Sequence, residues 1–131
     1  MIEFHLDSRS GVATYLQIVQ QVEEALRLGT IDVGDQLPTV REVVADLAIN
    51  PNTVAKAYRE LERSGLVVAR QGRGTFVAST LAPASLGHYD VLRERLEGWL
   101  ADAKTAGLDE ESVKALVSAT LREKLAVRRV A

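Results

Sequence analysis

The 131-residue sequence has no cysteine, three prolines and a single tryptophan. The absence of cysteine excludes disulfides, thiolate metal sites and cysteine nucleophiles. Aromatic residues are scarce at 5%, but 47% hydrophobic and 26% charged residues describe a globular protein with a packed core. No run approaches the roughly 18 apolar residues of a membrane span, and the first ten residues lack the features of a signal peptide. We expect a cytoplasmic protein of one small domain plus an appendage, with no membrane partner.

Charge is unevenly distributed along the chain. The net charge of −2 argues against a polyanionic partner. Residues 1–49 carry three basic and eight acidic side chains, whereas residues 50–80 carry five basic and two acidic ones. Residues 81–131 balance at eight of each sign. A locally basic segment in an acidic chain is compatible with DNA binding.

The N-terminal segment predicts an extended stretch followed by a helix. Apolar and polar residues alternate over residues 2–7, which favours a short edge strand or an extended arm. Thr14 and Gln17 then have the spacing of a capping box, and apolar residues recur every three or four positions. This pattern predicts an amphipathic helix that ends near Gly29.

Two further helices are predicted close together. Thr39 and Glu42 form a second capping-box pattern, which begins a helix of about ten residues. Asn50 is a good N-cap, Pro51 suits the first helical position, and Gly65 is a typical terminator. Because only three or four residues separate the two helices and the second is longer and more basic, they match a helix-turn-helix.

A β-hairpin is predicted after these helices. Residues 66–70 and 75–78 are β-prone and flank the glycine-containing turn at residues 71–74. Three helices and a hairpin describe a winged helix, so the expected fold is mainly α with a small β-hairpin.

The C-terminal third predicts a two-helix dimerisation region. We divide the chain into a winged-helix DNA-binding domain with its arm (1–79), a linker (80–85) and a two-helix tail (86–131). The first tail helix stops at Gly107, and Asp109 caps the second. Two amphipathic helices cannot bury both apolar faces alone, so we expect a homodimer. The predicted dimerisation residues are Leu92, Leu96, Trp99, Leu100, Val113, Leu116, Val117 and Leu121.

Three motifs together carry a family resemblance. The segments LPTVRE (37–42), NPNTVAKAYREL (50–61) and GRGTFV (72–77) are spaced as in the winged helix of the GntR family of bacterial transcription regulators, which this sequence resembles over about residues 15–77. The short helical tail and the N-terminal arm look like the YtrA subfamily. This resemblance implies a homodimeric repressor, in a subfamily that often acts at operons for ATP-binding-cassette transporters. The two-fold symmetry of such a dimer predicts a near-palindromic operator. The tail is too short for the effector domain of larger members, and any effector is unknown.

The second helix of the predicted helix-turn-helix is expected to recognise DNA bases with the residues at its start. Asn52, Thr53 and Lys56 lie where side chains can enter the major groove. Alternatively, Asn50 and Asn52 only cap the helix, and Glu60, four residues after Lys56, neutralises the lysine.

Two arginines complete the predicted interface. The GntR resemblance implies that Arg41 contacts DNA; the alternative is a surface salt bridge to Asp46 or Glu42. Arg73 at the glycine-rich wing tip is expected to enter the minor groove or bind phosphate, unless the tip is an ordinary turn. The full predicted set is Arg41, Asn50, Asn52, Thr53, Lys56, Arg59, Gln71, Gly72, Arg73 and Gly74.

Other chemistry is not indicated. Tyr58 fits the core, His5 and His88 are far apart with no partners at metal-ligand spacing, and no catalytic set or cofactor motif is visible. An enzyme is therefore disfavoured. The principal alternative to a DNA-binding regulator is a winged-helix module whose tail binds another protein.

Overall fold

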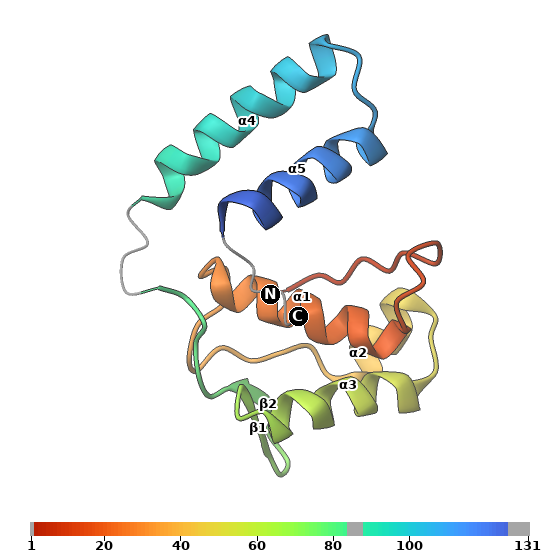
Figure 1. The fold of residues 1–131 in the computed structure, drawn as a ribbon. Coiled ribbons are helices and arrows are strands. Elements are labelled where there is room, and N and C mark those ends of the chain that lie inside the picture. Colours follow the sequence, from red (N-terminus) through yellow and green to blue (C-terminus); the bar gives the residue numbers. More distant parts are fainter. Residues whose placement is uncertain (1, 84–87, 126–131) are drawn as a thin grey trace, which may run out of the picture. The chain divides into compact units, whose positions relative to one another are not determined.

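Figure 1 shows the computed structural model, which describes residues 2–83 and 88–125. The chain divides into two compact units, Met1–Leu86 and Gly87–Ala131. Of the predicted linker, residues 84 and 85 lie outside the described residues. The elements are α1 (Thr14–Arg27), α2 (Val40–Leu47), α3 (Pro51–Arg63), β1 (Val67–Arg70), β2 (Gly74–Val77), α4 (Tyr89–Thr105) and α5 (Glu110–Lys124).

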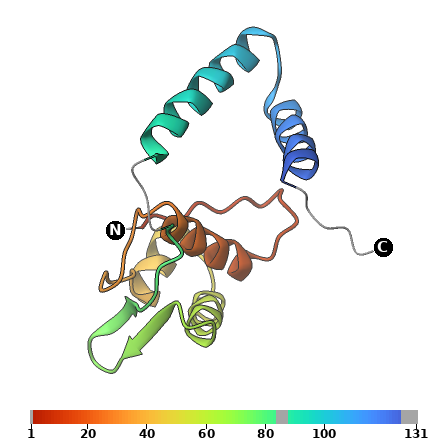
Figure 2. The same cartoon turned by 60° about the vertical axis from the view of Figure 1, so that its left-hand side comes forward.

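The first unit is a winged helix, as the sequence predicts. α3 packs against both α1 and α2, and the antiparallel hairpin follows at the end of α3 (Figures 1 and 2). With the two C-terminal helices, this confirms the predicted fold class. The core of this unit is formed by Phe4, Ile18, Val22, Ala25, Leu26, Ile31, Leu37, Val43, Val54, Ala57, Tyr58, Leu61, Leu66, Val67 and Val77.

The predicted helix starts of α2 and α3 are confirmed. The Thr39 hydroxyl accepts from the Glu42 N–H while the Glu42 carboxylate accepts from the Thr39 N–H, so both halves of the capping box are formed. Asn50 caps α3, and Pro51 is its first residue. α2 has eight residues instead of about ten, because Ala48 adopts the left-handed conformation at φ +54° and ends the helix.

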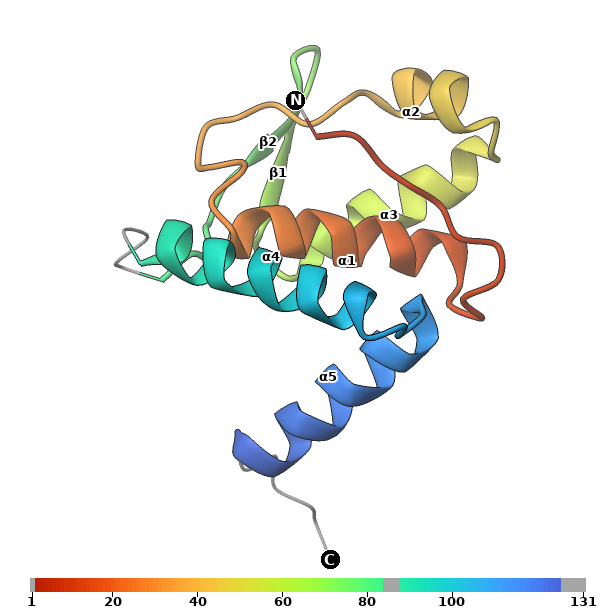
Figure 3. The same cartoon turned by 90° about the horizontal axis from the view of Figure 1, so that it is seen from above.

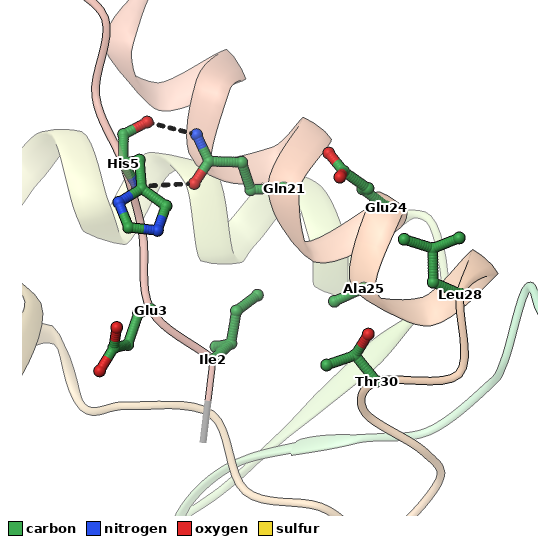
Figure 4. Close-up of a pocket in the computed structure, with 8 residues that line it drawn as sticks. All are labelled: Ile2, Glu3, His5, Gln21, Glu24, Ala25, Leu28 and Thr30. Carbon is green, nitrogen blue, oxygen red and sulfur yellow. Dashed lines mark hydrogen bonds between the residues drawn. The ribbon is translucent and has the colours of Figure 1, made fainter. Parts of the chain in front are cut away.

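The N-terminal segment is an extended arm and not a strand. It runs back along α1 (Figure 3), with Phe4 buried in the core. The side-chain amide of Gln21 accepts from the His5 N–H at 2.8 Å and donates to the His5 carbonyl (Figure 4). A primary amide offers the same donor and acceptor as a peptide group, so a helix side chain satisfies the backbone that a neighbouring strand would otherwise pair with.

The capping box predicted at Thr14 and Gln17 is wrong. No side chain caps α1, and Gln17 is buried. Its amide accepts from the Asp7 N–H at 2.8 Å and donates to the carbonyls of Asp7 and Val12, both at 2.9 Å. Gln17 holds the arm and its turn against α1, which is a different use of the same residue.

The hairpin is shorter at its turn than the sequence predicts. Gly74 belongs to β2 and pairs with Arg70, so residues 71–73 form the tip. A bridge between Gln36 and Phe76 adds the preceding loop to the outer edge of β2. β2 is therefore paired on both of its edges.

The second unit is a pair of helices, and the junction between them lies where the sequence predicts it. α4 ends just before Gly107, and the Asp109 side chain caps α5 by accepting from the Ser112 N–H at 2.8 Å. Hydrogen bonds from Ser112 hold the pKa of Asp109 below its ordinary value. Among the described residues of this unit only Ala103 is buried. None of the described helices is long and apolar enough to cross a membrane.

Candidate nucleic-acid interface

The predicted DNA-contacting residues come from three places: the first turn of α2, the exposed side of α3 and the wing tip. α3 and the hairpin lie beside each other in Figures 1 and 2. Thr53 and Gly74 are half-buried, and the other eight predicted residues are exposed. Each of the ten is therefore at least partly accessible at the surface of this unit.

The beginning of α3 separates the roles of its two asparagines. The Asn50 side-chain oxygen accepts from the Asn52 N–H at 2.8 Å, so Asn50 is the N-cap of α3. The alternative that both asparagines cap the helix is thus correct for Asn50. Asn52 lies inside the first turn with its side chain exposed, and it does not cap the helix. The Thr53 N–H donates to the Asn50 carbonyl at 3.0 Å. The amide of Asn52 and the hydroxyl of Thr53 remain as candidate base readers.

Lys56 has an aromatic partner that the sequence does not reveal. Its Nζ lies 4.0 Å from the centroid of the Tyr15 ring on α1, within the range of a cation–π interaction. Glu60 pairs with Arg63 and not with Lys56, so the alternative in which Glu60 neutralises Lys56 is wrong. The ring attracts the ammonium group without cancelling its charge, so Lys56 stays available to a polyanion.

Arg41 lies where its charge is unfavourable to its own helix. A cation near a helix N-terminus opposes the helix dipole. The Glu42 carboxylate accepts from the Thr39 N–H at 3.1 Å, and within the described residues no ion pair to Arg41, from Glu42 or Asp46, is present. The salt-bridge alternative therefore finds no support in this structure, and Arg41 is exposed to solvent.

A buried hydrogen bond ties α3 to the start of α2. The Tyr58 hydroxyl donates to the Pro38 carbonyl at 2.6 Å, just before the capping box. Burial raises the pKa of Tyr58 well above its ordinary value, and the nearby Glu42 carboxylate raises it further. Tyr58 is a core residue, as predicted, and its hydroxyl also fixes the segment that leads to Arg41 relative to α3.

The wing tip is a tight turn that presents Arg73. The Arg73 N–H donates to the Arg70 carbonyl at 3.0 Å, and Gly72 has φ +73° at the third position of this turn, as in a type II turn. The Arg70 guanidinium lies 5.9 Å from the centroid of the Phe76 ring. Gln36, in the loop before α2, donates from its Nε2 to the Arg73 carbonyl at 3.0 Å. Gln36 is 37 residues from Arg73, so no local spacing in the sequence indicates this contact.

A separate hollow lies between the arm and α1 in the winged-helix unit. It has a volume of about 480 Å³ and is lined by apolar side chains together with His5 and the carboxylates of Glu3 and Glu24 (Figure 4). Across the described residues, no three histidine or acidic side chains are grouped closely enough to hold a metal ion. The lysine and arginine side chains of the predicted interface lie on α2, α3 and the wing, and none of them lines this hollow.

Comparisons with known proteins agree with this geometry. The family model described as "Bacterial regulatory proteins, gntR family" matches residues 14–77. The "HTH-type transcriptional repressor YtrA" of Bacillus subtilis is 38% identical over 109 residues, which cover 82% of this chain and 84% of that protein.

Two solved structures extend the likeness. The structure of YtrA from Sulfolobus acidocaldarius, a GntR-family transcription factor, has a TM-score of 0.54 at 33% identity over 75% of this chain and 97% of that one. AraR(DBD) in complex with operator ORX1 has a TM-score of 0.52 at 26% identity over 59% of this chain and 96% of that one. The chain thus belongs to the GntR family of bacterial regulatory proteins and is a winged-helix, DNA-binding transcription regulator.

Proposed function

We propose that this regulator is a homodimeric, sequence-specific repressor that binds a near-palindromic operator in the cytoplasm. In this proposal residues 1–79 form the DNA-binding domain, 80–85 the linker and 86–131 the dimerisation region. The observation that carries the DNA-binding part is Arg41, an exposed cation at an unfavourable helix position with no carboxylate partner among the described residues.

The exposed residues of the winged helix fall into reading and positioning roles. Asn52 and Thr53 would contact base edges in the major groove, where amides suit adenine and hydroxyls are permissive. Arg41, Lys56 and Arg59 would contact phosphate or guanine. Gln71, Gly72 and Arg73 of the wing tip and the adjoining Gly74 of β2 would lie at the minor groove. Asn50 would shape the start of α3.

The tail supports the homodimer because its apolar face is uncovered. Val113 is half-buried, Trp99 and Val117 are each 36% exposed, and the five leucines of this face are more exposed still. Several of them line an apolar groove of about 460 Å³ between α4 and α5. Exposed patches of this kind mark interaction surfaces, and two-fold dimers are the commonest soluble oligomers. The full proposed set is Leu92, Leu96, Trp99, Leu100, Val113, Leu116, Val117 and Leu121.

A two-fold dimer would present two winged-helix domains to DNA. Its symmetry requires two similar half-sites in opposite orientation, which is a near-palindrome. We further propose that the operator controls a transporter operon of the ATP-binding-cassette class. This last element rests on the YtrA resemblance alone.

Selection from random duplex DNA tests the proposal. The purified full chain and an Arg41→Ala variant are each used to enrich bound duplexes at two salt concentrations. The proposal expects an enriched inverted repeat with the natural chain and loss of that enrichment with the variant. Weak, salt-labile retention without any motif would contradict it and would favour a protein partner for the tail.

A further inference from the structure

The loop before α2 acts as an additional strand for the wing. The Leu37 N–H donates to the Thr75 carbonyl at 2.9 Å, and the Val77 N–H donates to the Asp35 carbonyl at 2.8 Å. The Gly34 N–H donates to the Val77 carbonyl at 2.9 Å. β2 is thus paired with β1 on one edge and with this loop on the other.

Gln36 extends this support to the wing tip. Its Nε2 donates to the Arg73 carbonyl at 3.0 Å, while the Arg73 N–H donates to the Arg70 carbonyl. Both backbone groups of Arg73 are therefore held. In a short turn, these two hydrogen bonds fix the peptide planes on either side of the Arg73 Cα, which carries the side chain.

The glycine next to Arg73 makes room for this contact. A Cβ at Gly74 would lie 2.6 Å from Gln36 Nε2, and the residue has φ +122°, which side chains of L-residues rarely tolerate. The absence of a side chain at Gly74 lets the amide pass over the strand and reach Arg73. Gln36, Gly74 and the Arg73 carbonyl form one arrangement.

We propose that Gln36 is a positioning residue for DNA binding. It holds the wing tip in an ordered conformation before Arg73 contacts the duplex. This inference rests on the proposed function, because it assigns Arg73 a contact with DNA. A tip that is ordered before binding loses less conformational entropy in the complex, so affinity rises without a new contact. Gln36 itself needs no contact with DNA.

The test combines binding with a measurement on the free protein. Gln36→Met keeps the length of the side chain and removes the donor. Gln20→Met, at an exposed position of α1, is the matched control. We expect Gln36→Met to weaken binding to the enriched operator about 3- to 10-fold, the effect of one hydrogen bond. In the free variant, the heteronuclear ¹⁵N NOE at the backbone amides of residues 72–74 should fall, while the thermal midpoint stays unchanged.

A double-mutant cycle with Arg73→Ala separates this inference from the proposed function. If Gln36 acts through Arg73, Gln36→Met has less than about a 2-fold effect in the Arg73→Ala background. An equal effect in both backgrounds overturns the positioning role. So does operator binding that Gln36→Met leaves unchanged while Arg73→Ala weakens it, and this result leaves the proposed function intact. If the natural chain binds no DNA, both fail.

Discussion

The two units of this chain solve the problem of burying apolar surface in different ways. The winged-helix unit encloses a core of fifteen residues drawn from the arm, three helices, the hairpin and the loops between them. The two-helix unit buries only Ala103 among its described residues and leaves Leu92, Leu96 and Leu121 about half exposed. A helix pair with such a face needs a further surface to cover it. The first unit therefore buries its own apolar residues, while the second exposes the face that the proposed homodimer would cover.

The largest expected effect comes from breaking this association. Leu116→Asp places a charge on the exposed apolar face of α5, where a second copy would bury it at high cost. Loss of the dimer removes the gain from two linked half-sites, so operator affinity should fall at least about 100-fold. Electrophoretic mobility shifts with the full operator measure this loss.

Ala115→Asp is the matched control for that variant. Ala115 is exposed on the same helix but lies outside the apolar groove. It should bind the operator like the natural chain. Equal losses in both variants would show that a negative charge on α5, and not dimerisation, governs affinity.

A smaller effect is expected at the complete unit. Arg41→Ala should weaken operator binding about 10- to 100-fold, the range of one specific arginine contact. The thermal midpoint should stay unchanged because the side chain is exposed and within the described residues has no ion-pair partner. Fluorescence anisotropy and circular dichroism measure the two quantities. Arg93→Ala, which removes the same charge from α4, should leave affinity unchanged, and a loss of helicity in Arg41→Ala would contradict this account.

Tyr58→Phe tests the internal bond between α3 and the start of α2. It leaves the buried Pro38 carbonyl without its donor, so the free energy of unfolding should fall by about 1–2 kcal/mol at neutral pH. Urea denaturation at a fixed protein concentration measures this change. Tyr15→Phe, which removes a hydroxyl from a half-buried ring, should have a smaller effect.

The same pair of variants gives a pH dependence of known sign. Because the pKa of Tyr58 is raised in the folded state, the unfolded chain releases that proton first, near pH 10. Its contribution to stability is complete below about pH 10 and is lost as the pH rises further. Tyr58→Phe should lose less stability over this range than the natural chain. An identical decline in both would contradict the burial of the hydroxyl.

The smallest effect is expected at the turn of the helix-turn-helix. Ala48 has φ +54°, which is strained for a residue with a Cβ, so Ala48→Gly should stabilise the winged helix by about 0.5–1 kcal/mol. Ala45→Gly, inside the same α2, should destabilise it by a similar amount. Calorimetry measures both shifts. A lower thermal midpoint for Ala48→Gly would show that the left-handed turn is not a source of strain.

Sequence reasoning succeeded where the signal is local. The capping box of Thr39 and Glu42 and the Asn50 cap act within one helical turn, so their spacing is visible in the chain. The same reasoning misassigned Gln17, because the spacing of a capping box does not reveal that the side chain is buried against an arm. Alternation over residues 2–7 marked an extended segment but did not identify what satisfies its backbone.

The candidate site was only half visible in the sequence for the same reason. Exposed residues such as Arg41 and Arg73 are found by motif and spacing. The contacts that support the site join segments that are far apart in the chain. They are the Tyr15 ring against Lys56, the hydrogen bond from Tyr58 to Pro38 and the hydrogen bond from Gln36 to Arg73. Tertiary packing creates these contacts, and no local pattern encodes them.

Sedimentation equilibrium of the full chain at micromolar concentration, alone and with the enriched operator, tests the central claim most directly. A homodimer requires two chains in the free species and two chains on each operator duplex, and Leu116→Asp should be reduced to single chains. Single chains of the natural protein, both free and on DNA, would contradict it and would leave the apolar face of α4 and α5 for another partner.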